Sequence, residues 1–256
     1  MVRIDDVYQK VLALANKEQR GYITPQEFNL FAHQAQMEIF EQYFYDLDKW
    51  FKQHGNHTTY ADMVTNIEQK ISYFKRWDID FSAVVGNLGD IRLAQNPQQE
   101  EIYRLLSVRV SSRAGEPLYI AEDVQVGEEA FLYQSSALAR STITRPTYWK
   151  RENLGDIMIR IEPAPLISTP FDPAIDGVVR ISYIKTPTIP RWGYVVDQLG
   201  NALFDGSNSV DFELHSSDET ELVYKILMLS GIAIQRDDIT SAGQTLEKQQ
   251  VQQEKQ

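Results

Sequence analysis

TPQEFNLFAHQAQMEIFEQYFYDLDKWF, residues 24–51, forms one long helical pattern with a marked start. Thr24 is a typical N-cap residue, and Pro25 suits the first helical position because its missing N–H would be unpaired there anyway. Glu27 lies three residues after the cap, where its carboxylate can reach back to the backbone N–H of Thr24. The spacing predicts a helix from Pro25 to about Phe51.

This long helix is apolar around much of its circumference. One stripe contains Phe28, Phe31, Ala35, Ile39 and Gln42, and another contains Leu30, Met37, Phe40, Phe44, Leu47 and Phe51. Such a helix is covered on more than one side. The 13 Tyr, 11 Phe and 4 Trp of the chain belong mostly in a core. The two-sided pattern nevertheless favours contact with a neighbouring subunit over a simple monomer core.

Two further amphipathic helices are predicted beside it. Apolar residues recur at three and four positions from Ile4 to about Ala15, before Gly21 closes the region. After a break at residues 54–57, the same period runs from Tyr60 to Phe74.

After about residue 100 the apolar period changes from 3.6 to 2, which is typical of strands. The alternating segments are Leu106–Val110, Leu118–Ile120, Ala130–Leu132, Ile157–Ile161 and Val179–Tyr183. Residues 147–150 and 157–161 flank a turn at 153–156 and predict a hairpin. Residues 193–197 and 202–205 flank Gln198–Asn201 and predict another.

The helical period returns near the C-terminal end. Ser216–Glu219 has the pattern of a second capping box, and the apolar residues from Leu222 to Ala233 can face a core. Residues 240–256 contain few large apolar residues, so we expect this tail to be free or docked on a partner. The order predicts an α+β protein whose N- and C-terminal helices form one helical bundle with an inserted antiparallel β domain. The expected segments are a helical part over 1–100, the β domain over 101–215, and the closing helix and tail over 216–256.

Composition argues against several functional classes. The formal net charge of −11 is spread along the chain, and a protein that neutralises phosphates needs the opposite sign. The absence of cysteine removes disulfides, thiolate metal sites and cysteine nucleophiles. Asp5 and Asp6 stand where a signal peptide needs cations, and Val11–Ala15 is too short an apolar run for a membrane span. We expect a soluble protein that is not secreted by a standard route and has no membrane partner.

The best metal candidate is Asn16–Glu27, which partly matches an EF-hand loop. Gly21 occupies position six and Glu27 position twelve, but Arg20 places a cation where Ca²⁺ needs a ligand. Glu27 is also explained by the capping box. The interpretation as a helix start is therefore favoured over a calcium site.

Other chemistry-bearing patterns are weak. The histidines are His33, His54, His57 and His215, and none belongs to an HExxH arrangement. Gly86–Asp90 has only two glycines and is not followed by the Lys-Ser/Thr pair of a phosphate loop. No GxSxG or SxxK motif is present. Glu122–Asp123 and Glu128–Glu129 are adjacent pairs whose side chains point apart, so a solvated surface is favoured over an acid/base pair. We assign no catalytic, cofactor-binding or metal-binding residues.

Two stretches carry a family resemblance. Arg20–Asp48 (RGYITPQEFNLFAHQAQMEIFEQYFYDLD), together with Val210–His215 leading into Asp218–Leu227, resembles structural proteins of short-tailed bacteriophages of the crAss-like and related groups. The layout elsewhere is similar to that of their head-to-tail connector proteins, the adaptor or ring proteins beneath the portal.

The resemblance implies a non-enzymatic virion protein at the head-to-tail interface or tail, assembled in the host cytoplasm. It implies a homo-oligomeric ring, twelve-fold in the family, that binds the portal and further tail or ring proteins. Portal contact would fall in Thr240–Gln256. DNA would pass through the channel without sequence-specific binding, and the acidic composition fits such sliding.

A binding module is the main alternative. In this hypothesis the β domain recognises a carbohydrate or receptor, and Tyr148, Trp149, Trp192 and Tyr194 form an exposed aromatic platform. An enzyme has the least support from the sequence.

Overall fold

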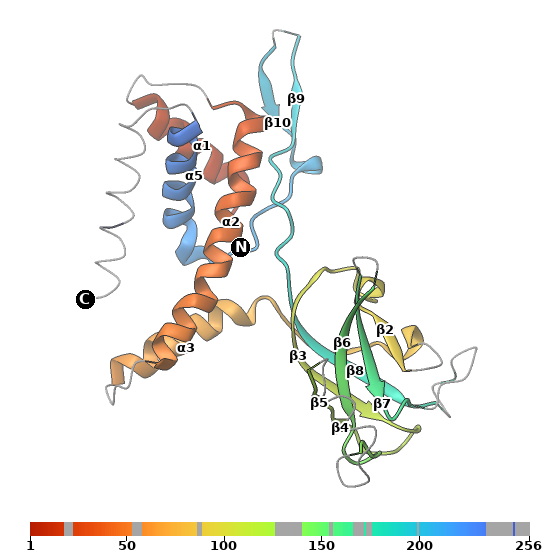
Figure 1. The fold of residues 1–256 in the computed structure, drawn as a ribbon. Coiled ribbons are helices and arrows are strands. Elements are labelled where there is room, and N and C mark those ends of the chain that lie inside the picture. Colours follow the sequence, from red (N-terminus) through yellow and green to blue (C-terminus); the bar gives the residue numbers. More distant parts are fainter. Residues whose placement is uncertain are drawn as a thin grey trace. The chain divides into compact units, whose positions relative to one another are not determined.

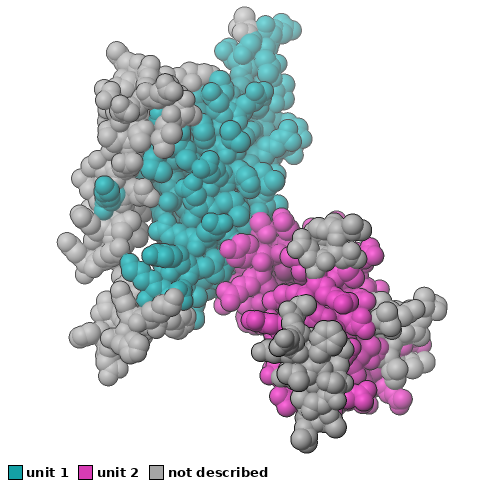
Figure 2. Space-filling view, in the orientation of Figure 1, with its two compact units in different colours: residues 1–73, 187–256 teal, residues 74–186 magenta. Residues whose placement is uncertain are grey.

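The structure is a computed structural model that describes residues 1–17, 23–52, 58–85, 89–125, 140–153, 156–165, 172, 176–198, 200–233 and 248. The chain divides into two compact units (Figure 2). The helical unit comprises residues 1–73 and 187–256, and the β unit comprises residues 74–186. The chain therefore passes from one unit to the other twice.

The helical unit is built around α2 (Pro25–Lys52), which packs against α3 (Thr58–Ser72) and α5 (Glu219–Ala233). The first helix, α1 (Ile4–Lys17), packs against α5 (Figure 1). The predicted helices over 4–15, 25–51 and 60–74 are confirmed to within a few residues. The described helices α1, α2, α3 and α5 lie close to the predicted ranges. The reason is that the residues that start and stop a helix are local in sequence.

The start of α2 has the predicted capping geometry. The Glu27 carboxylate accepts hydrogen bonds from the backbone N of Thr24 (3.0 Å) and from its hydroxyl (2.7 Å). The backbone N of Glu27 donates to the Thr24 hydroxyl (3.3 Å) in return. The buried side of α2 is one stripe, which comprises Phe28, Ala32, Ala35, Gln36, Ile39, Phe40 and Tyr43. Leu30 and Tyr45, outside this stripe, are 67% and 68% exposed.

A two-stranded hairpin of β9 (Tyr194–Val196) and β10 (Ala202–Phe204) also belongs to the helical unit. The antiparallel register pairs Val195 with Leu203 and Tyr194 with Phe204, which confirms the predicted hairpin. Two single-turn helices follow it, η3 (Gly206–Asn208) and η4 (Ser216–Asp218), and the latter leads directly into α5.

The described residues of the β unit form two four-stranded sheets. The first has the order β1-β8-β3-β4, and the second has the order β2-β7-β6-β5. The strands are β1 (Lys75–Asp80), β2 (Asp90–Arg92), β3 (Ile102–Ser111), β4 (Tyr119–Ile120), β5 (Glu122–Asp123), β6 (Thr147–Asn153), β7 (Asp156–Glu162) and β8 (Val178–Lys185), with short helices η1 (Ser82–Val84) and η2 (Leu93–Gln95) between them. The predicted hairpin at 147–161 is confirmed as β6 and β7.

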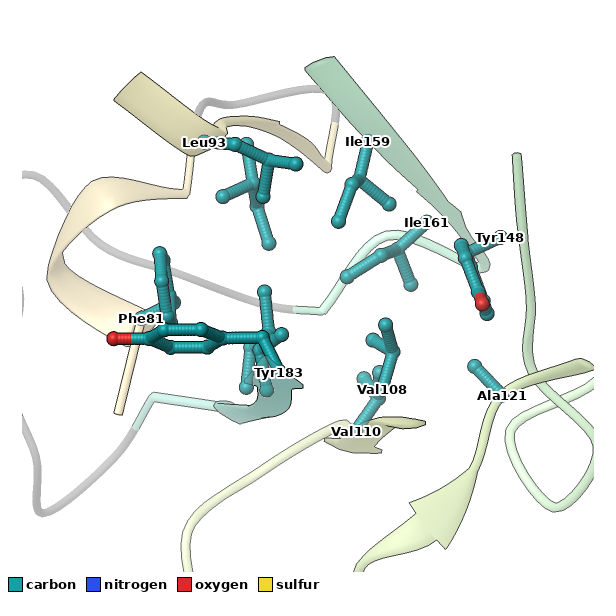
Figure 3. Close-up of a cluster of buried hydrophobic side chains, with 12 residues drawn as sticks. Phe81, Leu93, Val108, Val110, Ala121, Tyr148, Ile159, Ile161 and Tyr183 are labelled. Carbon is teal, nitrogen blue, oxygen red and sulfur yellow. The ribbon is translucent and has the colours of Figure 1, made fainter. Parts of the chain in front are cut away.

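The core of the β unit lies between these sheets. Side chains of β6 and β7 point toward those of β3 and β8 (Figure 3). The cluster consists of Phe81, Ile91, Leu93, Val108, Val110, Ala121, Tyr148, Ile159, Ile161, Val179, Ile181 and Tyr183. Alternate residues of β3, β7 and β8 enter it, as period-two patterning requires. Leu106 is an exception and is 38% exposed, because the register of β3 shifts between Leu105 and Ser107.

The predicted fold class needs correction. The chain is α+β, but the expected single helical bundle with one inserted antiparallel β domain is wrong. The four described helices are distributed along the chain, the strands form three separate sheets, and β5 pairs with β6 in parallel. Strands also begin at Lys75 rather than after about residue 100.

The physical reason is that periodicity identifies an element and not its partner. The hairpin of β9 and β10 has strand patterning, yet its flanking segments are bound to α2. Gln36 Nε2 donates to the carbonyl O of Thr188 (2.8 Å), and Gln36 Oε1 accepts from the backbone N of Glu213 (3.1 Å). These contacts join residues more than 150 positions apart, and no local pattern contains them.

Candidate interaction surface

Trp192 anchors the hairpin to the helices. Its side chain is 2% exposed, and its ring lies 4.3 Å from that of Tyr8 between centroids. Its indole Nε1 donates to Asp5 Oδ1 of α1 (3.1 Å). Its backbone N donates to Asn29 Oδ1 (2.7 Å), and its carbonyl O accepts from Asn29 Nδ2 (3.2 Å). Both helices therefore fix the residue from which the hairpin rises.

The first and last residues of the hairpin, Tyr194 and Phe204, also pack against Trp192. The ring of Tyr194 is stacked on that of Trp192 at 5.9 Å, and the ring of Phe204 lies 5.8 Å from it. Gly193 sits at a close approach of two backbones, since a Cβ there would lie 2.7 Å from the carbonyl group of Asn208. The base of the hairpin is thus tightly packed.

Beyond its base the hairpin presents apolar side chains to solvent. Val195 and Leu203 lie opposite each other on one face, and both are 57% exposed. Val196 on the other face is 59% exposed. In Figure 1 the hairpin extends past the N-terminal end of α2. Exposed aliphatic side chains on both faces of a hairpin are unusual for a surface that remains in contact with water. They are typical of an interaction site.

The two strands also have unpaired outer edges within the described part of the chain, because their sheet contains just β9 and β10. An isolated two-stranded hairpin is marginally stable in water, and an exposed apolar edge promotes association with other chains. The anchored base fixes the position of the hairpin while its outer part still offers area to be buried. We call Val195, Val196, Leu203 and Phe204 the hairpin patch.

A buried polar network joins three helices near the start of α5. Asp218 is 3% exposed and accepts hydrogen bonds from the Tyr43 hydroxyl (2.6 Å) and from Lys70 Nζ (2.6 Å). Burial, and then the Asp218 charge, raises the pKa of Tyr43 far above its ordinary value. The phenol therefore stays protonated and donates, which suits a structural link between α2, α3 and η4.

A second network lies in the β unit around Glu100. Arg76 donates to both carboxylate oxygens from Nε (3.2 and 3.1 Å), and its Nη2 adds a bond of 2.9 Å. The Tyr183 hydroxyl donates to Glu100 (3.2 Å) and accepts from Asn96 Nδ2 (2.8 Å). Burial is the largest cause that raises the pKa of Tyr183. This network ties the start of β1 to β8 and to the segment before β3.

The residue at the last position of the candidate calcium loop already has another role. Glu27 caps α2, and its hydrogen bonds with Thr24 lower its pKa. Residues 18–22 of the loop lie outside the described residues. Among the residues that the structure describes, no group of three or more His, Asp or Glu side chains could hold a metal ion.

The two described histidines, His33 and His215, belong to different elements. His54 and His57 lie outside the described residues. The Nδ1 atom of His215 accepts from the backbone N of Ser217 (3.2 Å) and thus caps η4, a role predicted for Ser216. His33 on α2 is half-buried, and its Nδ1 has no hydrogen-bond partner in the described structure.

Glu122 and Asp123 each form an ion pair with a different basic side chain. Arg145 contacts Glu122 (3.1 Å), and Lys150 contacts Asp123 (3.2 Å). The members of the pair therefore point apart, as expected for a solvated surface. Glu128, Glu129 and most of the Gly86–Asp90 segment lie outside the described residues, and so does the tail 240–256 apart from Lys248.

The predicted aromatic platform is wrong. Tyr148, Trp149 and Trp192 are only 5%, 7% and 2% exposed, so a sugar ring has no face on which to stack. Burial, and then Asp123, raises the pKa of Tyr148 to about 12. Tyr194, the first residue of β9, is half-buried and stacks on Trp192.

The hairpin patch was missed at the level of sequence, although a signal exists. Val195–Val196 and Leu203–Phe204 are adjacent apolar pairs, and neighbouring strand residues point to opposite faces. Such pairs make both faces apolar, which a hairpin with one solvated face does not need.

Comparison with known proteins adds no assignment. No family model matches the sequence, and neither does any curated protein. No helix in the described ranges has the length and apolar character needed to cross a membrane.

Proposed function

We propose that this chain is a non-enzymatic structural subunit of a short-tailed bacteriophage virion. It assembles as a cyclic homo-oligomer below the portal, extends the DNA channel and docks the next tail component. The observation that supports this proposal best is the hairpin patch, because four exposed apolar residues stand on a base fixed by Trp192 and Asn29. Such a surface completes its burial against another chain.

Two features of the sequence support the particular kind of assembly. Arg20–Asp48, together with Val210–His215 leading into Asp218–Leu227, resembles structural proteins of these phages, and the layout elsewhere is similar to that of their connector proteins. The net charge of −11 suits a channel through which DNA slides, since like charge disfavours adsorption. The virion location and the twelve-fold symmetry belong to this proposal and rest on the resemblance.

The mass of the purified protein in solution tests the proposal. We expect light scattering or mass photometry to give a defined multimer at micromolar concentration, and negative-stain images to show closed rings. A monomer at all accessible concentrations would contradict self-assembly. A monomer that binds glycans in an array would instead favour the carbohydrate-binding alternative.

A further inference from the structure

The hairpin is acidic as well as apolar. Residues 194–210 include Asp197 and Asp205 but no lysine or arginine. Asp205 accepts hydrogen bonds from the backbone N of Ser207 (2.9 Å) and from Asn208 Nδ2 (2.7 Å), which lower its pKa. Each carboxylate directly follows a member of the hairpin patch. A partner for this hairpin therefore needs an apolar surface with positive charge beside it.

The outer face of the β1-β8-β3-β4 sheet has that character. A row of residues crosses all four strands, with Asp80 opposite Arg180, Arg180 opposite Arg109, and Arg109 opposite Ile120. The neighbours of these residues along β3 and β8 are buried in the core, so the row faces away from it. Ile120 is 70% exposed. We call these four residues the outer row.

Asp80 lies opposite Arg180 in the outer row, but its Oδ1 atom accepts hydrogen bonds from the backbone N and the hydroxyl of Ser82. Two arginines that face each other on adjacent strands repel. Arg109 forms an ion pair with Asp78, whereas Arg180 is exposed and has no ion pair among the described residues. The row thus offers an aliphatic contact at Ile120 on β4 and, two strands away on β8, an available guanidinium at Arg180.

We propose that the hairpin patch of one copy binds the outer row of a second copy. This pairing rests on the proposed ring. A contact between two hairpins brings Asp197 and Asp205 of both copies together, and a contact between two rows brings arginines together, so like charges disfavour both. Pairing of unlike patches joins apolar to apolar and acid to base. It is a heterologous contact, the type that generates rings when the rotation closes.

Two variants and a matched control test the pairing. The hairpin variant carries Val195→Thr and Leu203→Thr, and the row variant carries Ile120→Thr and Arg180→Glu. The control carries Leu30→Gln and Arg113→Glu, which remove an exposed apolar residue and reverse an exposed charge elsewhere. Circular dichroism melts establish that each full-length chain is folded. Self-association is then measured by analytical ultracentrifugation.

Each variant alone should associate at least about tenfold more weakly than the wild type, and the control should associate normally. An equimolar mixture of the hairpin and row variants should form a 1:1 complex and grow no further. The reason is that the intact hairpin of the row variant binds the intact outer row of the hairpin variant. The two altered surfaces that remain cannot bind a further copy. Asp197→Lys added to the row variant should restore part of the association.

Two results overturn the pairing: a row variant that assembles like the wild type, or a mixture that stays monomeric. These are distinct from failure of the proposed function. If the wild type itself is monomeric, the ring is wrong. If the wild type and the row variant both form rings, the ring stands and the pairing of hairpin with outer row is wrong.

Discussion

Trp192 is the residue on which the position of the hairpin depends most. It contributes a buried ring, an indole hydrogen bond to Asp5 and two backbone bonds to Asn29. Tyr8, Tyr194 and Phe204 all pack against the same ring. One residue therefore joins α1 and the hairpin through its side chain and α2 through its backbone.

Trp192→Phe should lower the free energy of unfolding by about 1–3 kcal/mol, because it removes buried ring area and the partner of Asp5. Chemical denaturation measures the change. Trp77→Phe is the matched control, since Trp77 is 63% exposed. The control should stay within about 0.5 kcal/mol of the wild type. Equal losses in the two variants would contradict the anchoring role.

Tyr43 gives the molecule a pH dependence above about pH 10. Its pKa is raised in the folded protein by burial and by Asp218, so the unfolded chain loses the phenol proton first. Its contribution to stability is complete below the ordinary pKa of tyrosine and falls as the pH rises beyond it. Between pH 10 and 11 the wild type should lose up to about 1.4 kcal/mol more than Tyr43→Phe.

Parallel stability curves for the wild type and Tyr43→Phe over this range would contradict the raised pKa. At pH 7 the same variant should cost about 1–3 kcal/mol, because the buried Asp218 carboxylate loses a donor. Urea titrations at each pH provide both comparisons.

At the scale of the element, the hairpin depends on a close approach that glycine permits. A Cβ at Gly193 would lie 2.7 Å from the backbone of Asn208, which belongs to η3. The residue that leads into β9 and the helix η3 that follows β10 therefore pack so closely that no side chain fits at position 193.

Gly193→Ala should destabilise the protein by about 1–3 kcal/mol, as overpacking does, and should weaken self-association. Gly206→Ala is the control from the same segment, because its Cβ would meet Phe204 at an ordinary 3.7 Å. Thermal melts and ultracentrifugation of the two variants check this. A Gly193→Ala protein with unchanged melting and association would show that this approach is unimportant.

The elements themselves were largely predictable, while their partners were not. The capping box of α2 spans four residues, and the hairpin turns lie between short alternating segments, so local sequence contains both signals. Asn29 and Trp192 are 163 positions apart, and nothing near either residue announces the other. The prediction of an aromatic platform failed for the same reason, because Tyr148 is buried in the core between the two sheets and Trp149 lies against Arg160 of the neighbouring strand β7.

At the scale of the whole molecule, the proposed portal contact can be separated from folding. Deletion of Thr240–Gln256 should leave the melting temperature unchanged, because this stretch contains only Leu246 and Val251 as sizeable apolar residues. The deletion should abolish incorporation beneath the portal. Complementation of a phage that lacks the wild-type gene, followed by analysis of purified particles, measures this. Normal incorporation of the truncated chain would contradict the docking role.

The division of the chain into units has a consequence for biosynthesis. The helical unit is made of residues 1–73 and 187–256, and α5 packs against α1 and α2 across the intervening segment. During translation the β unit, which is continuous in sequence, emerges complete before α5 has been made. The surfaces of α1 and α2 that pack against α5 therefore stay uncovered until α5 has been made. In this chain the part made first is the part that finishes folding last.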